Sequence, residues 1–548
     1  MKGRHAGTSQ STSSALSSVV GMASTVITLL IVTSLTMWTL STTTARSRGD
    51  GRRRGGRGGE RRRPNIVFFL ADDLGFNDIG YHNPTMKTPN LDRLAAEGIK
   101  LENYYVQPVC SPTRSQLISG RYQIHTGLQH SIIWVAQPNC HPVTDPTIAQ
   151  KLAEAGYSTH AVGKWHLGFY RKACWPTRRG FDSFFGMLTG SANFYTHRHM
   201  GGQWNLPGSG NWSGYDLRDN LEQVGQDYQD VYSTHLFTQK SQAIIREHDQ
   251  SKPLFLYHAF QTVHFPLQVP AHYYAEFGHI ADEKRRVYAG MVKCMDEAVG
   301  NITATLKESG MWNNTLLIFS TDNGGNLKYG GNNWPLRGGK RSLWEGGIRA
   351  VGFVSSPLLP KSARGTVHKN LFHVTDWFPT LVKGVAKGSL RGTNVDGYDV
   401  WKLLKRSGRN TGSADWPRKE IVHNIDPYSA LSPALPQRFF TTFPAAIRYD
   451  NWKLLTSQSE NGSWVAPPES SEKTVHLRES PQKRVWLFNL ADDPNEKHDL
   501  SLERWDVSTA LLRRLGRYLR QSVPVYFPPP DSRANPALHN DSWSDWVK

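Results

Sequence analysis

Cysteine and acidic residues are both scarce in this chain. Only four cysteines occur in 548 residues, which is too few for a scaffold built on disulfides. Asp and Glu number 46 against 64 Lys and Arg, so the formal net charge is +18. The chain also lacks internal repeats, and outside one arginine-rich tract nothing in it indicates nucleic-acid binding. The length and a hydrophobic content of 38% predict one large core with a smaller second domain.

The positive charge is concentrated near the N-terminus. Residues 46–63 contain nine arginines against Asp50 and Glu60, a charge of +7, and we expect this tract to be disordered. A solvated linker is the simpler interpretation, and contact with a membrane or a polyanion is the alternative. With Lys2 and Arg4 also subtracted, the rest retains 18 − 7 − 2 = +9. That charge suits a polyanionic substrate, but it also suits a merely soluble basic surface.

An apolar segment diluted by Ser and Thr lies at residues 15–44, just before this tract. It is typical of a cleaved signal peptide or of an uncleaved membrane anchor within residues 1–45. The arginines that follow would violate the positive-inside tendency of an anchored lumenal protein, which favours cleavage near Thr44 or Ala45. Five N-x-[ST] sequons also favour the secretory route, to the lysosome or the outside: Asn211, Asn301, Asn313, Asn461 and Asn540.

Short apolar runs alternate with helical patterns over most of the chain. Strands are predicted at 65–71, 158–162, 253–260 and 315–320, and helices at 88–98 and 283–310. This alternation predicts an α/β fold with a large, mostly parallel sheet covered on both faces. Strands at 443–455 and 484–490 and a helix at 508–521 predict a smaller C-terminal α+β domain with an antiparallel sheet. We expect the larger domain to span 64–430 and the smaller one 431–548.

Unusual polar residues follow each of the four predicted strands. Any one of them could be a turn or a helix-capping residue, but their joint placement favours one shared crevice at the carboxyl ends of the strands. In chain order the residues are Asp72, Asp73, Lys164, His166, His264, Asp322 and Asn323.

The oxygen-bearing residues of this set suit a hard divalent cation. Zinc sites usually include His or Cys, whereas carboxylate and amide oxygens suit Ca²⁺ or Mg²⁺. Three carboxylates that converged without a cation would repel one another strongly. If Asp72, Asp73 and Asp322 meet, a divalent ion is therefore expected.

One cysteine occupies a distinctive sequence, CSPTRSQLISGR, at residues 110–121. Pro112 fits the first turn of a helix, so Cys110 should lie near the helix N-terminus, where free N–H groups favour anions. Arg114, one turn later, reinforces that preference. The alternative is an ordinary thiol in a loop before a helix.

This motif resembles the sulfatase signature, in which C-x-P-x-R directs oxidation of the cysteine to formylglycine. A second sulfatase-like signature, GYSTHAVGKWHLG, occupies residues 156–168. The strings RYQIHTGLQHSII, GNNWPLRGGKRSLWEGGIRA and HNIDP are most similar to the branch that contains arylsulfatases B, I and J. The resemblance covers roughly residues 64 to 540 and implies an alkaline-phosphatase-like sandwich fold.

The resemblance also implies an activity and a set of roles. A formylglycine-generating enzyme would convert Cys110 into the nucleophile for sulfate-ester hydrolysis of aryl sulfates or sulfated glycans. The expected glycans are galactosaminoglycans with N-acetylgalactosamine 4-sulfate groups. Arg114 would steady the formylglycine and His166 would hydrogen-bond its hydrate. The resemblance gives one Ca²⁺ bound by Asp72, Asp73, Cys110, Asp322 and Asn323, and a sulfate surrounded by Lys164, His166, His264 and Lys340.

Some positions depart from the family pattern. Ser119 stands where relatives usually have Thr, and the loop 193–220 lacks the cysteines that usually form a disulfide there. Cys140 and Cys174 match a family pair and are expected to form a disulfide, whereas Cys294 is expected to be a buried thiol.

Two other functions are compatible with such a chain. A phosphatase or phosphodiesterase of the same superfamily is disfavoured by Cys110 and by the oxygen-donor set. A non-catalytic glycan-binding protein is disfavoured because the whole set of site residues is present.

Overall fold

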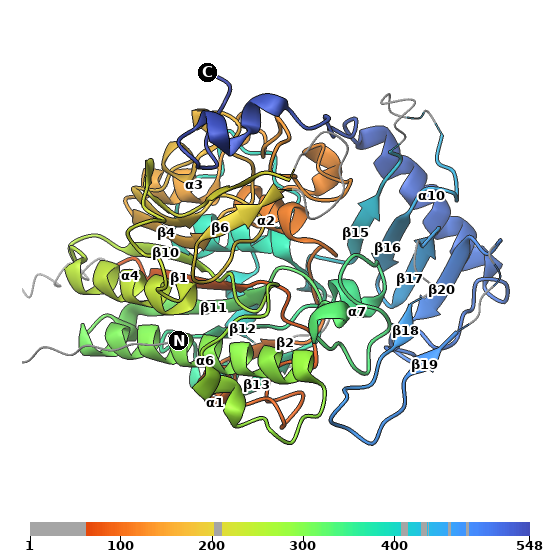
Figure 1. The fold of residues 1–548 in the computed structure, drawn as a ribbon. Helices are drawn as coiled ribbons and strands as arrows, with labels where there is room; N and C mark the ends of the chain where they lie inside the picture. The colour runs from red at the N-terminus through yellow and green to blue at the C-terminus, as the bar shows by residue number, and fades with distance from the viewer. Residues whose placement is uncertain are drawn as a thin grey trace, which may run out of the picture. The chain divides into compact units, whose positions relative to one another are not determined.

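A ten-stranded, mostly parallel sheet organises the fold (Figure 1). The computed structural model describes residues 62–201, 211–406, 415–428, 436, 438–458, 462–477, 480 and 482–548. The strand order is β13-β2-β12-β11-β1-β10-β4-β5-β8-β9. Parallel pairing links the five strands from β11 to β5, namely β11 (Thr315–Thr321), β1 (Asn65–Ala71), β10 (Leu254–Ala259), β4 (Ser158–Lys164) and β5 (Ser183–Met187). The flanking strands are β12 (Gly352–Ser355), β2 (Ile99–Leu101), β13 (Thr366–His368), β8 (Arg218–Asp219) and β9 (Glu222–Gln223).

The central strands are apolar throughout because helices cover both faces of the sheet. In β1, Ile66 and Phe68 point to one face and Val67 and Phe69 to the other, and all four are buried. The second face is covered by α1 (Pro89–Ala96), α4 (Ser233–Glu247), α5 (Ala271–Ala275) and α6 (Glu283–Glu308). The first face is covered by α2 (Cys110–Ser119), α3 (Ile148–Glu154), α8 (Trp377–Pro379), η9 (Thr380–Val385) and α9 (Trp401–Leu404). The predicted α/β sandwich is confirmed.

A second, antiparallel sheet follows near the C-terminus. Its strands are β15 (Glu420–Ile425), β16 (Ala445–Tyr449), β17 (Trp452–Thr456) and β20 (Val485–Asn489), in that order. Helix α10 (Trp505–Gln521) packs Leu511, Leu515 and Leu519 on one face of this sheet. The other face meets α7 (Glu345–Ile348) through Trp344 and Trp486, whose rings are 5.6 Å apart.

This sheet includes β15, which precedes the predicted boundary between residues 430 and 431. Residues 61–548 form one compact unit, so the division into two domains stays a prediction. The predicted strand region 443–455 is a hairpin, because Asp450 turns the chain with a positive φ of 48° between β16 and β17.

Three small strand pairs lie outside the two larger sheets. They are β3 (Tyr104–Tyr105) with β14 (Phe372–His373), β6 (Arg198–Met200) with β7 (Ser213–Tyr215), and β18 (Ser463–Trp464) with β19 (Val475–His476). The loop 193–220, which lacks the cysteines of the family pattern, contains the β6–β7 hairpin.

The C-terminal segment returns from α10 to the main body (Figure 1). Ser542 forms a bridge with Tyr215, and Trp543 is fully buried in the core on the α2 face. The last residues of the chain therefore stabilise a region far away in sequence.

The predicted disulfide between Cys140 and Cys174 is present, and Cys294 is a buried free thiol. Four sequon asparagines are exposed (Asn211, Asn301, Asn313 and Asn540), and Asn461 lies outside the described residues. The predicted leader and most of the arginine-rich tract also lie outside them. Within the described part of the chain, no helix is long and apolar enough to span a membrane.

Candidate active site

The carboxyl ends of neighbouring strands bring the predicted site residues together. Asp72 and Asp73 follow β1, Asp322 and Asn323 follow β11, and Lys164 is the last residue of β4. His264 lies beyond β10, and Cys110 is the first residue of α2. Contacts among these side chains join residues that lie 38 to 250 positions apart in the chain.

Three buried ion pairs neutralise the three carboxylates. The Lys164 ammonium lies 2.5 Å from Asp72 Oδ2, and the Lys340 ammonium lies 2.5 Å from Asp73 Oδ1. The Arg114 guanidinium donates to Asp322 Oδ2 at 2.8 Å. The side chains are almost completely buried, so an unpaired charge here would be costly.

The two adjacent carboxyl groups differ in their affinity for a proton. Burial and the neighbouring charge of Asp322 raise the pKa of Asp72 to about 7. Burial also acts to raise the pKa of Asp73, but Lys340 and His264 outweigh it and hold that pKa below its usual value. Additional positive charge beside Asp72 would therefore stabilise its ionised form.

The site fits a hard divalent cation. Ligand atoms of Asp72, Asp73, Cys110 and His264 all lie within 4.8 Å of one another. The Asn323 amide donates to Asp73 Oδ1 at 2.7 Å, while its buried Oδ1 has no hydrogen-bond partner among the described residues. An orphaned amide oxygen beside carboxylates is the donor chemistry that Ca²⁺ takes.

Cys110 is poorly suited to act as a thiol. Its Sγ lies 3.6 Å from Asp72 Oδ1, and its side chain is buried at the N-terminus of α2. Burial, together with the charge of Asp322, raises the pKa of the thiol to about 12. Because the thiolate is the nucleophilic form of cysteine, an unmodified Cys110 would remain inert near neutral pH.

Arg114 connects the ends of two strands. Besides binding Asp322 from β11, it donates to the Lys164 carbonyl oxygen at the end of β4, at 2.9 Å. Its position one turn after Cys110 therefore fixes the distance between the lysine and the carboxylate cluster.

The two histidines are held in fixed positions. His166 has a positive φ of 51°, its Nε2 is 3.2 Å from the Ile133 carbonyl oxygen, and its buried Nδ1 has no partner among the described residues. Gly190 allows this placement, because a Cβ there would lie 2.6 Å from the imidazole. His264 Nδ1 is 2.6 Å from the Phe265 carbonyl oxygen. Burial is the main reason that the pKa values of both histidines lie well below the usual range. The charge of Lys164 lowers the pKa of His166 further, and the charge of Lys340 lowers that of His264.

Four of the predicted site residues line one cavity of about 550 Å³, whereas the three carboxylates, Asn323, Arg114 and Lys164 are not among its lining residues. Cys110, His166, His264 and Lys340 line it, so a substrate that enters can reach the Cys110 side chain.

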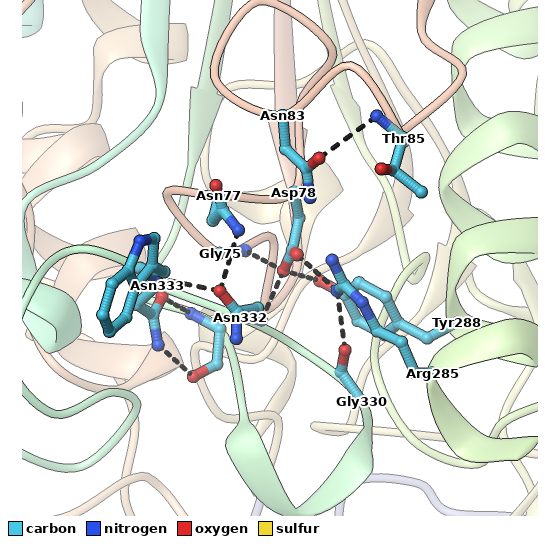
Figure 2. A network of polar contacts seen from close by, with 12 residues as sticks. Gly75, Asn77, Asp78, Asn83, Thr85, Arg285, Tyr288, Gly330, Asn332 and Asn333 are labelled. Carbon is cyan, nitrogen blue, oxygen red and sulfur yellow. Dashed lines mark hydrogen bonds and ion pairs between the residues drawn. The ribbon is translucent and has the colours of Figure 1, made fainter. Parts of the chain in front are cut away.

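A second layer of polar contacts fixes the loop after Asp73 (Figure 2). Asp78 pairs with Arg285 of α6 at 2.5 Å and accepts hydrogen bonds from the Asn332 N–H at 2.8 Å and the Tyr288 hydroxyl at 2.8 Å. The Tyr288 hydroxyl also lies 3.1 Å from the Asp73 carbonyl oxygen. Asp78 is the next acidic residue after Asp72–Asp73 in the sequence, but only the fold gives it partners more than 200 residues away.

The neighbouring loop that carries Lys340 is braced by one amide. Asn333 accepts from the Gly325 N–H at 2.8 Å and donates to the Gly338 carbonyl oxygen at 3.2 Å (Figure 2 shows the residue). The Lys340 N–H donates to the Gly325 carbonyl oxygen at 3.1 Å. Sequence reasoning missed these supporting residues, because no local pattern distinguishes them from other loop asparagines.

Comparison with known proteins identifies the family. The sulfatase family profile matches residues 64–385. The chain belongs to the sulfatase family. Mouse arylsulfatase J is 49% identical to this sulfatase over 498 residues, which cover 88% of this chain and 80% of the relative. Human arylsulfatase A is 30% identical and covers 80% of this chain and 83% of its own length.

Other relatives agree with this assignment. Pig N-acetylgalactosamine-6-sulfatase is 29% identical, with 87% of this chain and 89% of the relative covered. Among solved structures, "Crystal structure of Ps i-CgsB" superposes with a TM-score of 0.70 at 28% identity and covers 87% of this chain and 98% of that one. The sulfatase is therefore a sulfuric ester hydrolase with the fold expected from its sequence.

Proposed function

We propose that this sulfatase hydrolyses N-acetylgalactosamine 4-sulfate groups of galactosaminoglycans with a formylglycine nucleophile made from Cys110. The observation that carries the proposal is the placement of Cys110: a buried, inert thiol at a helix N-terminus, on the floor of a cavity lined by cationic and imidazole groups. Oxidation by a formylglycine-generating enzyme in the secretory pathway would replace that thiol with a hydrated aldehyde. The lysosome or the extracellular space is the proposed destination.

The donor set supports one Ca²⁺ held by Asp72, Asp73, Asp322 and Asn323 together with the modified Cys110. When bound, Ca²⁺ would acidify a hydroxyl of the hydrated aldehyde and offset negative charge on the sulfate oxygens. The three carboxylates and the three cations Lys164, Lys340 and Arg114 already sum to zero. A divalent ion therefore leaves a charge of about +2, which attracts a sulfate ester.

The protein side chains would bind the sulfate, orient the nucleophile and transfer a proton. Lys164 and Lys340 would bind sulfate oxygens through their ammonium groups. His166, whose buried Nδ1 has no partner in the part of the chain that the structure describes, would orient the hydroxyl at position 110. His264 or Lys340 would deliver a proton to the departing sugar oxygen. Arg114 would hold Asp322 in a fixed position relative to the nucleophile at position 110.

The choice of substrate rests on several independent supports. Net charge of +9 from Pro64 onward suits a polyanion. Relatives are named as N-acetylgalactosamine-6-sulfatases, and one similar structure was crystallised in complex with k-i-k-neocarrahexaose. The 4-sulfate position follows from the resemblance to the arylsulfatase B branch. Contact of residues 46–63 with a membrane or a polyanion is a further proposal.

Turnover by a matched pair of cysteine variants tests the function. We expect wild type and Cys294→Ala to hydrolyse an aryl sulfate and a disaccharide ending in N-acetylgalactosamine 4-sulfate. Cys110→Ala should lose at least about 10³-fold in kcat, because removing a nucleophile leaves only the binding contribution. An active Cys110→Ala enzyme would contradict the mechanism. Faster turnover of the matching phosphate ester would indicate a phosphatase, and glycan binding without turnover would indicate a binding protein.

A further inference from the structure

One wall of the cavity above Cys110 consists of residues that have no role in the proposed sulfate-ester hydrolysis. Gln107 and Gln129 come from segments beside α2, and Asn424 and Asp426 come from the end of β15. His130 completes this group, which we call the amide wall. The wall therefore joins the main body to the antiparallel sheet.

Two amides of the amide wall have buried atoms without partners. Gln107 is 1% exposed and Gln129 is 2% exposed. In each side chain, one of the two polar amide atoms forms a hydrogen bond. Gln107 Oε1 accepts from Gln123 at 3.0 Å, and Gln129 Nε2 donates to the Val523 carbonyl oxygen at 2.9 Å. Gln107 Nε2 and Gln129 Oε1 have no hydrogen-bond partner among the described residues. Buried polar atoms are normally paired, so an unpaired donor and an unpaired acceptor on two residues that line one cavity indicate a ligand.

The carboxylate of the amide wall is held rigidly. Asp426 Oδ2 lies 2.7 Å from His130 Nδ1, and Asp426 Oδ1 accepts from the Tyr428 N–H at 3.0 Å. The His130 ring stacks on Tyr428 at 4.1 Å and meets the edge of Phe527 at 4.7 Å. Each carboxylate oxygen still has lone-pair capacity for a donor from the cavity.

This combination selects one kind of ligand. A hydroxyl group both donates and accepts, so it can pair with Gln107 Nε2 and with Gln129 Oε1 or Asp426. A bare aryl ring would leave those atoms unpaired, and a second sulfate would be repelled by Asp426. The basic residues that line the cavity, Lys340 and Arg341, are consecutive in the chain and belong with the sulfate site.

We propose that the amide wall binds uncharged hydroxyl groups of the sugar ring that carries the scissile sulfate. This inference rests on the proposed sulfatase activity and adds the residues that distinguish a sugar from an aryl alcohol. It also predicts that a second sulfate on the same ring slows turnover because of Asp426.

The ratio of two activities tests the amide wall. We would measure kcat/KM for N-acetylgalactosamine 4-sulfate and for an aryl sulfate in Asp426→Asn and Gln129→Leu. The sugar value should fall about tenfold or more, with the aryl value within about twofold of wild type, because a site built to hydrogen-bond hydroxyls loses only substrates that offer them. Asp396→Asn is the matched control, since Asp396 also pairs with a histidine, His125, at 2.8 Å, but it does not line the cavity.

Four results would overturn the inference. The first is an unchanged ratio of the two activities, and the second is an equal fall of both activities in a variant that melts like the wild type. The third is an equal loss of activity on the sugar in Asp396→Asn. The fourth is a wild type that cleaves the aryl sulfate but not the sugar. Should either variant fail to fold, Gln129→Met keeps the side-chain length without the acceptor and carries the same test. A wild type without aryl sulfatase activity would refute the proposed function itself.

Discussion

The buried tryptophan of the C-terminal segment should contribute more to stability than its place six residues from the end suggests. Trp543 is 0% exposed and donates from its indole nitrogen to the His199 carbonyl oxygen at 3.1 Å. A Cβ on Gly201 would lie 3.0 Å from the indole ring, so the segment packs closely on the β6–β7 hairpin. His199 and Gly201 line the active-site cavity, which links this contact to the substrate region.

Trp543→Ala should lower the free energy of unfolding by about 4 kcal/mol, since large-to-small changes of buried aromatics cost about 3–5 kcal/mol. Unfolding entropy is about 2.1 cal/mol/K per residue near 60 °C, or about 1 kcal/mol/K for the roughly 490 residues from 62 onward. The midpoint of thermal unfolding should therefore fall by about 4 °C.

Scanning calorimetry at fixed calcium and protein concentration would measure this shift. Trp505→Ala is the matched control, because Trp505 begins α10 with 62% of its surface exposed and should change stability by less than about 0.5 kcal/mol. Equal midpoints for the two variants would refute the reasoning that the tail is a structural part of the main body.

Three further predictions concern buried charges and the cation. Asp78→Ala should destabilise the protein by about 3–5 kcal/mol, because the buried Arg285 guanidinium keeps only its second carboxylate partner among the described residues, Glu469 at 2.8 Å, and the Tyr288 hydroxyl and Asn332 N–H lose an acceptor. Asp506→Ala at the surface should have little effect on chemical denaturation. Burial raises the pKa of Glu496 from 4.5 to about 7, so its stabilising contribution is complete below about pH 4.5 and is lost as pH rises through 7. Between pH 5 and pH 8, the melting temperature of Glu496→Gln should therefore fall less steeply with pH than that of the wild type. The same pH dependence in both proteins would contradict the assignment of this effect to Glu496. Removing calcium with a chelator should abolish turnover and lower the melting temperature, since a ligand at 100 times its Kd contributes about 2.7 kcal/mol. Full activity after chelation would contradict the calcium proposal.

The strands of the main sheet were predictable because they are buried on both faces. Runs such as NIVFFLA at 65–71 have no polar residue after Asn65, a pattern typical of a parallel strand covered on both faces. The hairpin at 445–456 was harder to predict. Its turn at Asp450–Asn451 joins two strands that are each buried at four of five positions, so no long polar segment separates them.

The meeting of Asp73 with Asp322 and Asn323 was predictable because strand ends share one edge of a sheet, and their role as metal ligands stays a prediction. The ion pairs between Lys164 and Asp72 and between Lys340 and Asp73 were not predictable, because Lys340 lies on a loop 267 residues from its partner. Gln107 and Gln129 give no local signal at all. Their unpaired atoms become meaningful only when the fold buries them beside Asp426 of the second sheet.

Mass spectrometry of the tryptic peptide Leu101–Arg114 tests the central claim most directly. The protein should be produced in cells that contain the formylglycine-generating enzyme. The account predicts a peptide lighter than its cysteine form that reacts with an aldehyde-trapping reagent, in step with sulfatase activity. A free thiol at Cys110 in fully active enzyme would contradict it.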